Sequence, residues 1–148
     1  MFRTVLFLCA LLSAWSAIAG VRIEHWVSTS GARVYFVEAP ALPILDVQVD
    51  FAAGSMFDPP GKSGLAGLTR SVLDLGAGAL DENAIADRLA EIGARLGGGA
   101  DTDRALVSLR TLTDEDKMAS ALGVMRAVLQ SPRFDETVFA RERARADR

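Results

Sequence analysis

Residues 49–81, which read VDFAAGSMFDPPGKSGLAGLTRSVLDLGAGALD, decide the fold of this chain. They start as an alternating strand that ends in Ala-Gly-Ser and continue into a Pro-Pro turn. Gly64, Leu65 and Ala66 then begin a helix that ends near Gly76. Because glycine and proline interrupt regular structure at these places, the sequence predicts a strand, a turn and a helix in direct succession.

The predicted helix, residues 63–75, separates apolar from polar side chains. The apolar residues follow the three-four spacing of one stripe: Leu65, Leu68, Val72 and Leu75. The polar or small residues group on the opposite side: Gly67, Arg70, Ser71 and Asp74. This second face is either the wall of a site or a solvated face in which Arg70 and Asp74 form an ion pair.

The frame around this helix resembles the pitrilysin-like, or insulinase-like, M16-type zinc peptidase family, in which Gly-Leu-Ala leads into His-x-x-Glu-His. In that motif two histidines bind zinc and the glutamate deprotonates the zinc-bound water. The five motif positions are here Gly-Leu-Thr-Arg-Ser, residues 67–71. Gly67 and Ser71 therefore replace the imidazole ligands, and Arg70 replaces the general base. An arginine cannot accept a proton and would repel a dication.

The resemblance also implies a third ligand, a glutamate on a later helix. The run Phe-Ala-Arg-Glu-Arg at residues 139–143 looks like the approach to it, which places the ligand position at or next to Arg148. The degenerate site positions are thus Gly67, Arg70, Ser71 and Arg148. We expect no catalytic residue among them, and no metal or other cofactor bound by this chain, whereas an active homologue would carry zinc.

Composition supports this expectation, because the chain has one histidine, His25, and one cysteine, Cys9. Catalytic zinc sites are built mainly from His and Cys, with carboxylates in the minority. An active zinc metallopeptidase with displaced ligands remains an alternative hypothesis. Its candidate acids are Asp74, Asp81, Asp101, Asp103 and Glu142.

The first 19 residues have the pattern of a secretory signal peptide. Arg3 precedes a short apolar run, and Ala17-Ile18-Ala19 gives the small-residue pattern of a cleavage site after Ala19. The run is too short to span a membrane. We therefore predict a periplasmic or secreted bacterial protein with one M16-like domain over residues 20–148, truncated at its C-terminal end. The formal net charge of −3 argues against a nucleic acid partner.

The remaining pattern predicts an α+β layered domain with helices on a largely antiparallel sheet. Strands 21–27 and 33–38 form a hairpin, strand 44–51 alternates strictly, and strands near 93–103 and 104–112 form a second pair. Helices occupy 82–92 with an Asp81 cap, 114–130 with Thr113 or Asp114 as the cap, and a last segment from Asp135. The order of elements is βββααββαα.

A glycine run lies in the first strand of the second pair. No Gly-Lys-Ser/Thr follows it, which disfavours a phosphate loop. The family resemblance implies that this strand lies next to the motif helix and that substrate peptide adds to it as an extra strand. The residues of this possible peptide-binding strand are Gly97, Gly98, Gly99, Ala100, Asp101 and Thr102.

The sequence thus favours a catalytically inactive peptidase-like subunit. It would bind peptide substrates and form a hetero-oligomer with an active M16-type homologue, or regulate that homologue. A stand-alone structural or binding module is the second alternative. Its only local feature would be the group His25, Trp26 and Tyr35, which on strands is more typical of ordinary cross-strand packing.

Overall fold

The structure is a computed structural model that describes residues 20–146. Within these residues the chain divides into two compact units, one that ends at Ala41 and one that begins at Leu42. The predicted signal peptide, residues 1–19, lies outside the described residues. Between residues 20 and 146, no helix combines the length and the apolar character needed to cross a membrane.

The first unit contains the predicted hairpin. Strand β1 (Ile23–Val27) pairs antiparallel with β2 (Arg33–Val37), and His25 lies opposite Tyr35 in the register. The two rings stack at a centroid distance of 6.4 Å, which is the cross-strand packing expected of neighbouring aromatic residues. Gly31 in the turn has a φ of 87°, a conformation that favours glycine.

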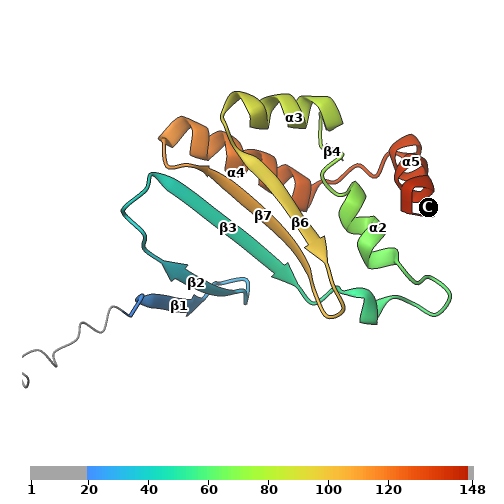
Figure 1. Ribbon diagram of the computed structural model, residues 1–148, viewed down its shortest axis with the longest axis horizontal. Coiled ribbons are helices and arrows are strands. Elements are labelled where there is room, and N and C mark those ends of the chain that lie inside the picture. The colour runs from blue at the N-terminus through green and yellow to red at the C-terminus, as the bar shows by residue number, and fades with distance from the viewer. Residues whose placement is uncertain (1–19, 147–148) are drawn as a thin grey trace, which may run out of the picture. The chain divides into compact units, whose positions relative to one another are not determined.

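The second unit is built on a three-stranded antiparallel sheet with the order β3-β7-β6 (Figure 1). Strand β3 is Ile44–Phe51, with the predicted bounds, β7 is Ala105–Leu112 and β6 is Arg95–Ala100. The central strand β7 provides the most deeply buried side chains of the sheet, because its alternate residues face the helices. Along β3 the alternation between half-buried and exposed residues follows the prediction up to Phe51, which is exposed.

Helices α3 (Glu82–Glu91) and α4 (Glu115–Gln130) contact β6 and β7 respectively. The Asp81 carboxylate accepts a hydrogen bond from the Ala84 amide, and the Asp114 carboxylate accepts one from the Lys117 amide, so both predicted caps are confirmed. Within residues 20–146 the core contains ten buried apolar residues: Val72, Ala77, Ile85, Ala94, Val107, Leu109, Ala121, Val124, Met125 and Val128.

Helix α2 (Leu65–Val72), which carries the degenerate motif, lies between β6 and α5 (Glu136–Ala146) (Figure 1). It is shorter than predicted. The main elements follow the predicted order βββααββαα, and the fold class is α+β as expected. The sequence pattern missed only short elements: the 3-10 helix η1 (Ser55–Phe57) and the hairpin of β4 (Gly76–Ala77) and β5 (Leu80–Asp81).

The Ala-Gly-Ser segment that follows β3 packs directly on the turn between β6 and β7. The Ser55 and Met56 amides donate to the carbonyl oxygens of Asp101 and Thr102, each at 2.9 Å. A Cβ atom at Gly54 would lie 2.5 Å from backbone atoms of Thr102 and Arg104. The close approach of these two loops therefore requires glycine at position 54.

We predict that Gly54→Ala lowers the free energy of unfolding by about 3 kcal/mol, because the added methyl group has no space between two backbone segments. Urea denaturation of the purified protein measures this. The matched control is Gly67→Ala in the middle of α2, where a Cβ meets no atom of the described chain within 4 Å. Alanine there should raise stability by up to about 1 kcal/mol. If Gly54→Ala is as stable as wild type, the close approach of the Gly54 segment to the β6–β7 turn is contradicted.

Candidate functional site

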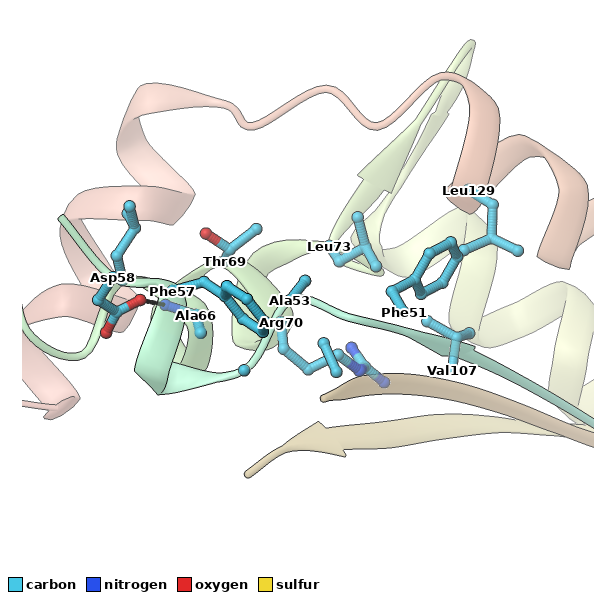
Figure 2. A pocket seen from close by; sticks show the side chains of 13 residues that line it. Phe51, Ala53, Phe57, Asp58, Ala66, Thr69, Arg70, Leu73, Val107 and Leu129 are labelled. Atoms are coloured by element: carbon cyan, nitrogen blue, oxygen red, sulfur yellow. Dashed lines mark hydrogen bonds between the residues drawn. The ribbon is translucent and has the colours of Figure 1, made fainter. Parts of the chain in front are cut away.

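The N-terminus of α2 is stabilised by a residue from the preceding loop. The helix starts after Gly64, whose φ is 89° and which has no side chain for capping. The Asp58 carboxylate accepts a hydrogen bond from the Gly64 amide at 2.8 Å. It accepts a second one from the Ala66 amide at 2.9 Å, which Figure 2 shows. The sequence analysis missed this cap. The signal that could have revealed it is an aspartate shortly before a helix that begins at glycine.

Two of the motif positions lie on an exposed surface of α2. Gly67 is exposed, and a Cβ atom there would meet nothing of the described chain within 4 Å. Ser71 is also exposed, and its hydroxyl donates back to the Leu68 carbonyl of the same helix at 2.8 Å. Glycine offers no ligand atom and a serine hydroxyl is a weak neutral one, so these positions do not fit a zinc ion.

The third motif position, Arg70, is buried, with 8% of the residue exposed. Its guanidinium forms the expected pair with Asp74 through two hydrogen bonds of 3.2 and 3.3 Å, and its Nε donates to the Leu106 carbonyl of β7 at 3.2 Å. The predicted ion pair between Arg70 and Asp74 is confirmed, but the alternative that placed Arg70 on a solvated face is wrong. The reason is tertiary: β6 packs beside α2 and covers this side of the helix.

Strand β6 is an edge strand of the three-stranded sheet within the described residues, and it lies next to α2 as the resemblance implied. It contains Gly97, Gly98, Gly99 and Ala100 but ends there. Asp101 and Thr102 are therefore wrongly included in the possible peptide-binding strand. They belong to the β6–β7 turn, and η1 residues already occupy their carbonyl oxygens.

The helix expected to lead to the third ligand, α5, contacts α2. Arg148 itself lies outside the described residues, so its role stays a prediction. Glu142 on α5 accepts hydrogen bonds from Arg141 at 2.8 Å and Arg145 at 2.7 Å. The hydrogen bond from Arg141 is the main cause that lowers the pKa of the Glu142 carboxyl, and the hydrogen bond from Arg145 also lowers it.

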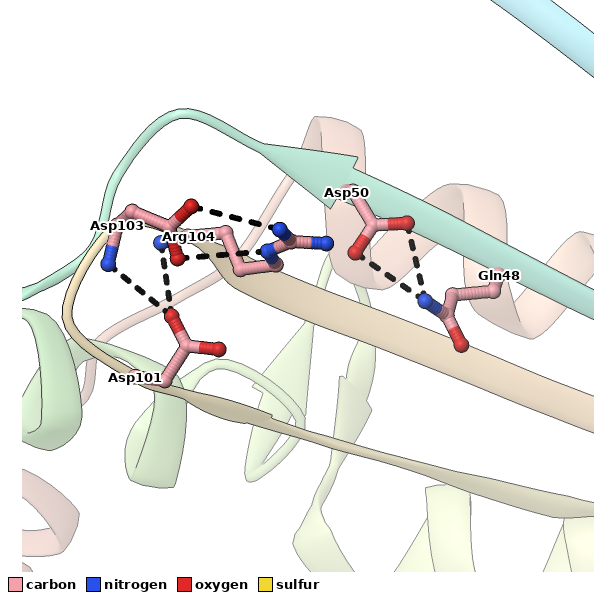
Figure 3. A network of polar contacts seen from close by, with 5 residues as sticks. All are labelled: Gln48, Asp50, Asp101, Asp103 and Arg104. Atoms are coloured by element: carbon pink, nitrogen blue, oxygen red, sulfur yellow. Dashed lines mark hydrogen bonds and ion pairs between the residues drawn. The ribbon is translucent and has the colours of Figure 1, made fainter.

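The other candidate acids have structural partners. Asp81 caps α3. Asp101 accepts hydrogen bonds from the Asp103 and Arg104 amides at 3.1 and 2.9 Å, and Asp103 pairs with the Arg104 side chain (Figure 3). The Arg104 hydrogen bond is the main cause that lowers the pKa of Asp103. Across residues 20–146, no three His, Cys, Asp or Glu side chains form a group that could hold a metal ion.

A cavity of about 370 Å³ opens beside α2, at the end of the sheet where β3 finishes (Figure 2). Its walls are mostly apolar and come from β3, η1, α2, β7 and α4. They include Phe51, Phe57, Leu65, Leu73, Val107 and Leu129. The polar side chains that line it are Asp58, Thr69 and Arg70, and the first and third of these are already hydrogen-bonded within the protein.

The comparisons with known proteins agree with this architecture. Residues 33–148 match the family described as Insulinase (Peptidase family M16). The chain belongs to the M16 peptidase family. No curated protein matches it. This family member therefore has Gly67, Arg70 and Ser71 at the three positions where the resemblance implies histidine, glutamate and histidine.

The solved structures that are similar to this M16 chain include two crystal structures. One is the crystal structure of a peptidase M16 inactive domain from Pseudomonas fluorescens, with 38% identity and a TM-score of 0.81, covering 84% of this chain and 30% of that one. The other is the crystal structure of a protease from Helicobacter pylori, with 18% identity and a TM-score of 0.72, covering 84% and 29%. The second likeness concerns the fold alone. This chain matches less than a third of the length of either structure.

We predict that Asp58→Ala lowers the free energy of unfolding by about 1 kcal/mol, because two amide groups at the start of α2 lose their acceptor. Asp58→Asn keeps a carbonyl acceptor and should lose less. Thermal or urea unfolding followed by circular dichroism measures both variants. Equal stability of Asp58→Ala and wild type would show that Asp58 does not cap the helix.

We also predict that the double variant Gly67→His, Ser71→His gains a metal site, because two histidines four apart on an exposed helical face can bind one ion. At a zinc concentration of about one hundred times Kd, binding should stabilise the variant by about 2.7 kcal/mol. Urea denaturation with zinc or with a chelator measures this difference. Wild type and the single variant Gly67→His are the controls. An unchanged denaturation curve would mean that positions 67 and 71 do not share one face.

Proposed function

We propose that this chain is an exported, non-catalytic M16 subunit that binds peptides and assembles with, or regulates, an active zinc-bearing homologue. The observation that carries the proposal is the replacement of the motif residues on α2 by Gly67, Arg70 and Ser71. The fold around the helix is that of the family, while these three residues provide neither imidazole ligands nor a general base.

The geometry of Arg70 strengthens the case against catalysis at this helix. A general base must be free to accept a proton from a metal-bound water. Arg70 instead places a permanent positive charge at that position, and its donors are directed to Asp74 and Leu106. The similar domain from Pseudomonas fluorescens is described as inactive, which agrees with a non-catalytic role for this chain.

Peptide binding is proposed from the position of β6. An edge strand presents backbone amides and carbonyls to which an extended peptide can add as a further strand. Residues 97–99 of β6 are all glycine, so the strand has few side chains that could obstruct an incoming peptide. Helix α2 lies next to this strand, so a peptide bound there would pass near the degenerate motif.

The proposed assembly with an active homologue rests on the family resemblance. This resemblance implies a fold built of two similar domains around a chamber, in which an inactive subunit can pair with an active one. A displaced zinc site in this chain is less well supported, since each of its candidate acids already has a structural partner. The signal-peptide pattern of residues 1–19 supports a periplasmic or secreted location.

The test is purification of the tagged full chain from its native host, followed by mass spectrometry and peptide hydrolysis assays with and without zinc. We expect a homologue that carries His-x-x-Glu-His to copurify, and hydrolysis by the complex but not by the chain alone. Zinc-dependent hydrolysis by the chain alone would instead support a displaced active site. A monomer that neither binds peptides nor recovers a homologue would support a stand-alone module.

A further inference from the structure

We infer that Arg70 and Gly98 form an interlocking pair that fixes the edge strand β6 against α2, which makes Arg70 a positioning residue for peptide binding. The binding part of this inference rests on the function proposed above. The contact between Arg70 and Gly98 stands on its own geometry. It gives the residue at the former general-base position a new role in place of catalysis.

The path of the Arg70 side chain is the first observation. Arg70 begins on α2, which contacts the edge strand β6, yet its Nε donates to Leu106 on the second strand, β7. In the register Gly98 lies opposite Val107, next to Leu106. A Cβ atom at Gly98 would lie 2.8 Å from the Arg70 Nε and would also collide with the Leu106 carbonyl oxygen. The guanidinium therefore reaches β7 through the space left by a missing side chain.

The second observation is the chemistry around the guanidinium. Asp74 contributes two carboxylate oxygens and Leu106 one carbonyl oxygen, so three acceptors converge on one buried cation. A planar guanidinium matches this arrangement, since Nε and both terminal nitrogens donate in fixed directions. Removing the cation would leave a half-buried carboxylate and a strand carbonyl with fewer donors, which is unfavourable away from water.

The third observation separates Gly98 from its two neighbours. Gly98 has a φ of 144°, which L residues rarely adopt. A Cβ atom at Gly99 would meet no atom of the described chain within 4 Å, and one at Gly97 would make only an ordinary contact of 3.7 Å with the Ser108 hydroxyl. Of these three glycines in β6, Gly98 is the one whose position leaves no space for a side chain. A glycine-rich strand is weak by itself, so an added bond from α2 to its neighbour β7 stabilises its position.

The test is amide hydrogen exchange of the full chain, comparing wild type with Arg70→Met, which keeps most of the length but has no donors. We expect exchange of residues 95–100 to become at least tenfold faster, while the buried amides of α4 change less than twofold. Arg70→Lys keeps the charge but not the planar fork, and should give an intermediate result. Arg126→Met on α4 is the matched control, because Arg126 is exposed and its side chain donates to Gln130 of the same helix.

Two outcomes would overturn the inference. In one, Arg70→Met leaves exchange of residues 95–100 within twofold of wild type. In the other, exchange accelerates equally in α4 and β6, which would indicate a general loss of stability. Gly98→Ala compared with Gly99→Ala gives an independent check, with faster exchange in β6 expected only for the first. If Gly98→Ala does not fold while Gly99→Ala does, that contrast also supports the requirement for glycine at position 98.

Peptide affinity gives the functional readout. Binding of a fluorescent, extended apolar peptide to the folded variants should weaken at least tenfold for Arg70→Met and by less than twofold for Arg126→Met. Equal affinity of Arg70→Met and wild type would overturn the positioning role. If wild type itself binds no peptide, the proposed function fails, while the exchange data still decide whether Arg70 fixes β6.

Discussion

The arrangement of α2, β6 and β7 depends on the hydrogen bonds of the buried Arg70 guanidinium. Arg70 is 8% exposed, and a cation this deeply buried is tolerated only where acceptors compensate for its lost hydration. Asp74 and Leu106 provide these acceptors. The requirement acts in both directions. Helix α2 must lie close enough for Arg70 to reach β7, and β6 must have glycine at position 98 for the side chain to pass. Helix position and strand composition are therefore linked by one side chain.

This linkage gives a physical account of an M16 domain whose motif positions differ from His-x-x-Glu-His. The positions do not change in the same way. Gly67 and Ser71 lie on an exposed surface, where the loss of a ligand needs no structural compensation. Arg70 is directed into the protein, where its buried charge requires a hydrogen-bond acceptor such as Asp74 beside it. The site where the family resemblance implies chemistry is here partly a solvent-exposed surface and partly a structural contact.

Much of the fold could be predicted from local sequence because its signals are local. The strict alternation of Ile44–Phe51 defined β3 to the residue, and Asp81 and Asp114 capped the helices that follow them. The missed features depend on contacts that no helical or strand period shows. Asp58 caps α2 across an intervening loop, and Gly54 is required by the β6–β7 turn. The short strands β4 and β5 have two residues each, too few to show a period.

By itself, the sequence determined the order of elements, the family frame and the absence of imidazole and carboxylate groups at positions 67, 70 and 71. Residue identity is enough for these conclusions, since glycine has no ligand atom, a serine hydroxyl is only a weak neutral ligand and an arginine repels a metal cation. Only the tertiary structure decided that Arg70 is buried and that Gly98, unlike Gly97 and Gly99, must be glycine. The reason is that helical and strand periodicity specify which residues share a face, but not which neighbouring segment covers that face.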